Sequence, residues 1–104
     1  MKIYDCHSHL YDSNSSTANF FFEDEPDGPL APERFAEHAL AEPVDRMFIS
    51  ANPDWIATPE GLADANDRVA ALVKCCPSRF SGLCQVNAHL PAESLREIYR
   101  HVAH

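Results

Sequence analysis

The apolar positions of this chain fall into short compact runs that alternate with longer stretches at helical spacing. Three short runs are typical of strands: KIYDCHSHL at 2–10, VDRMFIS at 44–50, and the segment from Phe80 to Val86. Three longer stretches are typical of helices: PERFAEHALAEP at 32–43, TPEGLADANDRVAALVKCCP at 58–77 and PAESLREIYRHVAH at 91–104. Strands that alternate with helices in this order predict an α/β fold, in which a parallel sheet is joined by right-handed crossover helices.

Residues in the helical stretches indicate where each helix begins, where it ends and which of its faces is apolar. Thr58 and Pro59 suit the first turn of the middle helix, and Pro77 ends it. Each helix is expected to cover the sheet with its apolar face. In the last helix the apolar residues recur at helical spacing, as follows: Leu95, Ile98, Tyr99 and Val102. Such an order predicts either a doubly wound sheet or the first part of a (β/α)8 barrel.

A segment rich in Ser, Asn, Asp, Gly and Pro separates the first strand from the first helix, and we expect a long loop over 11–32. Its FFF followed by EDEPD predicts either a lid over a site or an insertion with Phe20 to Phe22 against the body. At the other end, the helical pattern is still running at His104, which suggests an incomplete domain.

Composition narrows the class of protein. The 104 residues suffice for one domain, are 45% hydrophobic and 23% charged, and include no apolar run of membrane-spanning length. No signal peptide precedes the first strand, so we expect a cytoplasmic protein. The net charge of −8 and the absence of a basic cluster argue against nucleic acid as a partner. The four cysteines form no CxxC pair, and we expect reduced thiols that serve mainly in packing.

The hexapeptide DCHSHL at 5–10 carries the candidate chemistry. Side chains alternate along a strand, so Asp5, His7 and His9 are expected on one face, with Cys6 and Ser8 on the other. Two imidazoles on a rigid strand can bind a metal, and Asp5 would orient a histidine or bind the metal itself. HxH also arises by chance or at strand ends. Its place at the end of the first strand favours the metal, because ligands bind there in parallel α/β folds.

DCHSHL, followed by NDRVAALVKCCPSRFSGLCQVNAHLPAESLREIYR, resembles the amidohydrolase superfamily, specifically the amidohydrolase-related branch that includes aminocarboxymuconate semialdehyde decarboxylase. That branch has HxH on its first barrel strand and an Asn-led helix ending in PxRFxG. The matching residues here are Asn66, Pro77, Arg79, Phe80 and Gly82. The resemblance implies that residues 1–104 form three βα units of a metal-dependent (β/α)8 (TIM) barrel, usually with zinc, in which His7 and His9 are metal ligands. The family takes a further His and an Asp from later strands.

Other residues are weaker candidates. His89 and Trp55 follow the third and second strands, and each is either substrate-facing or structural, His89 as a loop residue and Trp55 as a buried anchor. Cys84 would act as a nucleophile only with a lowered pKa. The remaining helical histidines are expected at the surface, as follows: His38, His101 and His104.

Two hypotheses of different classes follow. The first is the N-terminal part of a metal-dependent hydrolase or decarboxylase that acts on a small carboxylated or cyclic molecule and is inactive, or nearly so, as an isolated chain. The second is a noncatalytic barrel module that binds metal weakly or acts by association. Both allow self-association through an open sheet edge. A metal-dependent DNase that also begins with HxH is disfavoured by PSRFSG and by the acidic charge.

Overall fold

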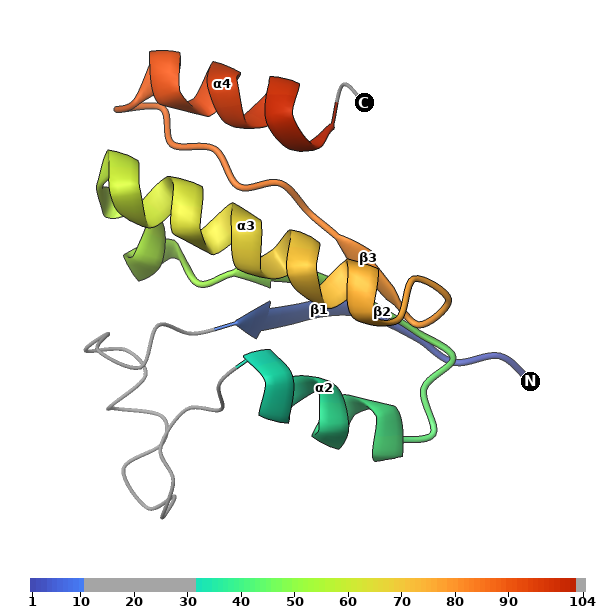
Figure 1. The fold of residues 1–104 in the computed structure, drawn as a ribbon. Coiled ribbons are helices and arrows are strands. Elements are labelled where there is room, and N and C mark those ends of the chain that lie inside the picture. The colour runs from blue at the N-terminus through green and yellow to red at the C-terminus, as the bar shows by residue number, and fades with distance from the viewer. Residues whose placement is uncertain (11–31, 103–104) are drawn as a thin grey trace.

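The computed structural model describes residues 1–10 and 32–102 (Figure 1). Its elements are β1 (Tyr4–Leu10), α2 (Pro32–Ala41), β2 (Arg46–Ala51), the 3₁₀ helix η1 (Pro53–Ala57), α3 (Pro59–Cys75), β3 (Phe80–Gly82) and α4 (Pro91–His101). Apart from Pro32, the predicted loop over 11–32 lies outside the described residues, and so does His104. Within the described ranges, no helix is both long and apolar enough to cross a membrane.

The strands β1, β2 and β3 form one parallel sheet in that order, with β2 in the middle (Figure 1). The predicted α/β fold with a parallel sheet and connecting helices is therefore confirmed. β3 is shorter than the predicted 80–86, and a last backbone bond of 2.8 Å runs from the Leu83 N–H to the Ile49 carbonyl. Beyond this bond the chain leaves the sheet, because the backbone of Gln85 is hydrogen-bonded to a side chain of α3. The Asn66 Nδ2 atom donates to the Gln85 carbonyl, and the Asn66 Oδ1 atom accepts the Gln85 N–H.

One hydrophobic core joins the sheet to α2, η1 and α3. Its buried members are Leu10, Ala36, Ala39, Ile49, Ala51, Trp55, Ile56, Leu62, Ala65, Val69, Leu72 and Phe80. The buried positions of α3 recur at spacings of three and four, so this helix turns its predicted apolar face inward. Each large apolar side chain buried in this way stabilises the fold by about 1.5–3 kcal/mol. The core therefore fixes the strands that carry the candidate site.

Local chemistry sets where α3 begins and how closely it approaches β3. The Thr58 hydroxyl accepts the backbone N–H of Gly61 at 3.0 Å, and Pro59 occupies the first turn, as predicted. Farther along the helix, a Cβ on Gly82 would lie 2.9 Å from Val69 Cγ1. The absence of a side chain at Gly82 is what allows β3 to lie directly against α3.

The last helix, α4, faces the opposite way from the prediction. Its large apolar side chains are exposed, with Leu95 at 54%, Ile98 at 38%, Tyr99 at 61% and Val102 at 61%. The buried positions are the polar Ser94 and Glu97. The reason is that α4 lies beside α3 rather than over the sheet (Figure 1). On this polar side, the Ser94 hydroxyl donates to the Asn87 carbonyl at 2.9 Å and accepts the Asn87 N–H at 2.8 Å.

Candidate functional site

The side chains of His7 and His9 meet near the carboxyl end of β1. Their Nε2 atoms are 2.8 Å apart, and the ring centroids are 4.5 Å apart at an interplanar angle of 69°. His7 is exposed and His9 is half-buried, so the pair is open to solvent on one side. The two rings thus turn the same nitrogen, Nε2, toward each other.

β1 is not a regular strand, because one extra residue is inserted between Asp5 and Ser8. Asp5 pairs with Met47 and Ser8 with Ile49, so three steps along β1 match two steps along β2. Side chains that pair across a sheet share a face, which places Asp5 and Ser8 on one face and His9 on the other. The expected alternation, with Asp5 beside the histidines and Ser8 opposite, is therefore wrong.

Asp5 bonds to its neighbours in the bulge. Its Oδ2 accepts the hydroxyl of Ser8, and its Oδ1 accepts the backbone N–H of His7 at 3.0 Å. The Ser8 bond, followed by the His7 bond, holds the pKa of the Asp5 carboxyl below its ordinary value. An ionised Asp5 therefore fixes the bulge, and the bulge sets the direction of His7.

The ring of His9 is positioned by Ser50, a residue that the sequence did not single out. Ser50 lies beside His9 on β2, is 4% exposed, and its Oγ is 3.1 Å from His9 Nδ1. When the Nδ1–H of His9 donates to Ser50, the Nε2 atom carries a lone pair that points at His7. A partner on the far ring nitrogen is the usual way in which proteins orient metal-binding histidines. The one sequence signal for Ser50 as a partner of His9 was its position at the end of the second predicted strand.

The donor chemistry of the pair fits a small divalent cation. Two nitrogens bound to zinc at about 2.0–2.1 Å lie about 3.3 Å apart at the tetrahedral angle. The observed 2.8 Å is shorter, so the two Nε2 atoms would have to move about 0.5 Å apart to bind zinc. Among the described residues, no third His, Cys, Asp or Glu completes a metal-ligand cluster with the pair. The pair therefore offers two ligands and leaves the other coordination positions open.

The two weaker candidates, Trp55 and His89, lie in very different surroundings. Trp55 is 9% exposed and belongs to the core, and the guanidinium of Arg68 lies 5.7 Å from its ring centroid. It has the environment of a buried loop anchor. His89 is exposed before α4, where its backbone N–H donates to Asn87 Oδ1 at 2.9 Å. Within the described part of the chain, His89 joins no cluster of potential metal ligands.

All four cysteines are free thiols. Cys6 and Cys75 are exposed, so the expectation that the thiols serve mainly in packing is wrong for these two. Cys84 is partly buried, and burial, together with the nearby Glu97 carboxylate, raises the pKa of its thiol. A raised pKa keeps the thiol protonated, which argues against Cys84 as a nucleophile.

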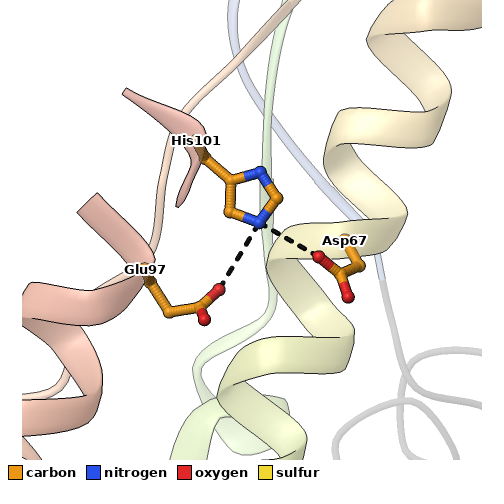
Figure 2. A group of neighbouring side chains, drawn as sticks. All are labelled: Asp67, Glu97 and His101. Carbon is orange, nitrogen blue, oxygen red and sulfur yellow. Dashed lines mark ion pairs between the residues drawn. The ribbon is translucent and has the colours of Figure 1, made fainter. Parts of the chain in front are cut away.

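A second group of side chains, between α3 and α4, could hold a metal ion (Figure 2). It consists of Asp67, Glu97 and His101, whose ligand atoms all lie within 4.8 Å of one another. The prediction that His101 lies at the surface is wrong, because its side chain is 19% exposed and its ring turns toward α3. A sequence signal existed, since Glu97 and His101 are four residues apart and share one face of a helix.

No protein-family model matches the chain, and no curated protein matches it. The resemblance to the amidohydrolase superfamily therefore rests on the sequence motifs alone, which are DCHSHL and the segment from Asn66 that contains PSRFSG.

Proposed function

We propose that this chain supplies the first three βα units of a metal-dependent (β/α)8 barrel of the amidohydrolase-related kind, with His7 and His9 as two of the metal ligands. The observation that carries the proposal is the 2.8 Å approach of their Nε2 atoms near the carboxyl end of a parallel strand. In parallel α/β folds, this edge of the sheet is where ligands bind.

Two uncovered surfaces favour a larger sheet. β3 pairs with β2 on one side only in the described structure, so its outer edge presents backbone groups to which a further strand can bond. Leu83 and Val86, just after β3, are 45% and 49% exposed, and α4 leaves its apolar face uncovered. A fourth βα unit beside β3 would bury this apolar surface, at about 25 cal/mol for each Å² removed from water.

When bound at the histidine pair, a divalent cation, most simply zinc, supplies Lewis acidity toward an attacking water or toward a substrate oxygen. The first use corresponds to hydrolysis and the second to decarboxylation. The chain itself holds the imidazoles in place, His7 through the bulge at Asp5 and His9 through Ser50. The substrate we propose is a small carboxylated or cyclic molecule. The net charge of −8 disfavours polyanions such as nucleic acids.

Two imidazoles are one fewer than the three protein ligands of a catalytic zinc site. We therefore expect the chain by itself to have little or no turnover. The same shortfall favours a second candidate, a noncatalytic barrel module that binds metal weakly or acts by association. The free thiols fit the cytoplasm as the compartment for either candidate.

Zinc titration of the metal-free chain by calorimetry tests the metal proposal. The His7→Ala, His9→Ala double variant is expected to bind one zinc equivalent fewer than the parent chain. His89→Ala is the matched control, because it removes an exposed imidazole from another part of the chain. It is expected to bind zinc as the parent does. Equal zinc binding by the double variant and the parent would remove His7 and His9 from the site.

A further inference from the structure

We propose that Asp67, Glu97 and His101 form a second divalent-cation site, between α3 and α4 and independent of the histidine pair on β1. The three side chains converge from two helices (Figure 2). His101 Nε2 lies 3.0 Å from Asp67 Oδ1 and 3.5 Å from Glu97 Oε2. One imidazole nitrogen and two carboxylate oxygens are a ligand set that suits Zn²⁺ and its neighbours among the first-row metals.

The imidazole nitrogen of this group is buried without a hydrogen bond. His101 Nε2 is shielded from solvent, and its approach to the two carboxylates lacks hydrogen-bond geometry. When the His101 ring is neutral with its proton on Nδ1, the Nε2 lone pair faces two carboxylates and is repelled by them. A buried nitrogen without a hydrogen bond is also costly. A cation among the three groups would remove both penalties.

Charge at the cluster favours a cation as well. Glu97 is 2% exposed, and its carboxylate and that of Asp67 share the guanidinium of Arg100, with N–O distances of 2.5 Å to each. Two carboxylates and one guanidinium leave a formal charge of −1 when His101 is neutral. Because the Arg100 side chain is 40% exposed, it can move into water when a metal takes its place. Arg100 and a metal ion would therefore compete for the carboxylates of Asp67 and Glu97.

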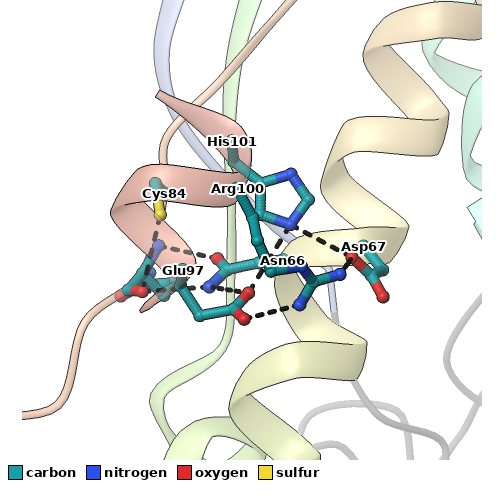
Figure 3. A network of polar contacts seen from close by, with 7 residues as sticks. Asn66, Asp67, Cys84, Glu97, Arg100 and His101 are labelled. Carbon is teal, nitrogen blue, oxygen red and sulfur yellow. Dashed lines mark hydrogen bonds and ion pairs between the residues drawn. The ribbon is translucent and has the colours of Figure 1, made fainter. Parts of the chain in front are cut away.

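Neighbouring residues hold Glu97 in place, and a groove connects the cluster with solvent. Asn66 Nδ2 donates to Glu97 Oε2 at 3.3 Å and to the Gln85 carbonyl at 3.0 Å, so Glu97 is anchored to the segment after β3 (Figure 3). A groove of about 860 Å³ opens at the cluster, and Asp67, Arg100 and His101 line it. Ligands fixed by neighbours and reachable from solvent are what a metal site needs.

The test separates this site from the one on β1, because it uses the His7→Ala, His9→Ala chain as its parent. Zinc chloride is titrated into this metal-free parent by calorimetry, and circular dichroism checks that each variant is folded. One zinc equivalent is expected to remain. Adding His101→Ala is expected to weaken its binding about tenfold or more, whereas adding His89→Ala leaves it unchanged.

Arg100→Gln distinguishes a metal site from a purely structural ion pair. If Arg100 competes with the metal, the Arg100→Gln variant of the same parent binds zinc several-fold more tightly. No zinc binding by the His7→Ala, His9→Ala parent would overturn the proposal without touching the site on β1. Zinc affinity that His101→Ala leaves unchanged, or that Arg100→Gln weakens, would overturn it too.

Discussion

His7 and His9 are held by two different contacts. The backbone N–H of His7 is bonded to the Asp5 carboxylate inside the bulge, whereas the ring of His9 is held through its Nδ1 atom by Ser50. The first contact sets the path of the chain and the second sets the rotation of a ring. Because Ser50 acts on the ring alone, its effect on metal binding can be measured without disturbing the strand.

Replacing Ser50 by alanine is expected to weaken zinc binding at the histidine pair by about 10- to 100-fold, the usual cost of losing such a partner. The zinc Kd would be measured in a His101→Ala chain, in which zinc binding between α3 and α4 is weakened, so that the measured Kd is that of the site on β1. Ser81→Ala is the control, because the Ser81 hydroxyl accepts from Arg46 Nη1 at 2.8 Å and the change is chemically the same. If both substitutions leave the Kd unchanged, Ser50 does not orient His9.

Cys84 is expected to react slowly with alkylating reagents. Burial and then Glu97 raise the pKa of its thiol above the ordinary value of 9.0, so little thiolate is present below that pH. Iodoacetamide labelling followed by peptide mass spectrometry would compare Cys84 with Cys6 and Cys75, which are exposed in the same chain. Labelling of Cys84 at the rate of Cys6 would contradict the proposed environment.

Part of this residue-level detail could be predicted from the sequence. The HxH pattern on a strand was enough to bring His7 and His9 together, because residues two apart share a face. The bulge and the role of Ser50 could not be predicted, since both depend on how β1 pairs with β2. His101 was misjudged because its partner Asp67 lies on another helix, 34 positions earlier in the chain.

At the scale of elements, α4 shows that the periodicity of apolar residues predicts a helix but not its packing partner. Leu95, Ile98 and Tyr99 predicted a helix correctly, but the spacing of apolar residues does not say which neighbour the helix meets. In the described structure α4 is attached through Ser94 and Glu97 instead. β1, β2, α2 and α3 were predicted closely because compact runs and caps such as Thr58 are local signals, whereas β3 ends four residues before the predicted Val86.

Because Ser94 is buried and Leu95 is exposed on α4, substitutions at these adjacent residues are expected to differ in their effect on stability. Ser94→Ala removes both hydrogen bonds to Asn87 and is expected to lower the free energy of unfolding by about 1–3 kcal/mol. Leu95→Gln changes a residue that is 54% exposed and is expected to stay within about 0.5 kcal/mol of the parent. Urea unfolding measures both values. A larger loss for Leu95→Gln than for Ser94→Ala would mean that α4 packs through its apolar face.

At the scale of the whole molecule, the sheet, α2, η1 and α3 share one hydrophobic core, and among the described residues the sheet has two unpaired edges, at β1 and at β3. The order of strands and helices was predictable because each crossover follows from the sequence order alone. Whether this sheet belongs to a (β/α)8 barrel could not be predicted in this way, because a doubly wound sheet is built from the same βα units.

The exposed surfaces predict association of the isolated chain. Sedimentation velocity at rising protein concentration is expected to show an increasing average mass, as copies cover the β3 edge and the apolar face of α4. A chain with Leu95→Gln and Tyr99→Gln is expected to associate less, because both residues lie on that face. A monomer at every concentration would argue against uncovered barrel surfaces.

The most direct test of the central claim is a crystal structure grown with zinc, with anomalous scattering recorded at the zinc edge. We expect a zinc peak between His7 and His9, about 2.0–2.1 Å from the Nε2 atom of each. Zinc bound elsewhere on the chain, with the two rings still in contact and no metal between them, would contradict the claim that DCHSHL forms half of a metal site.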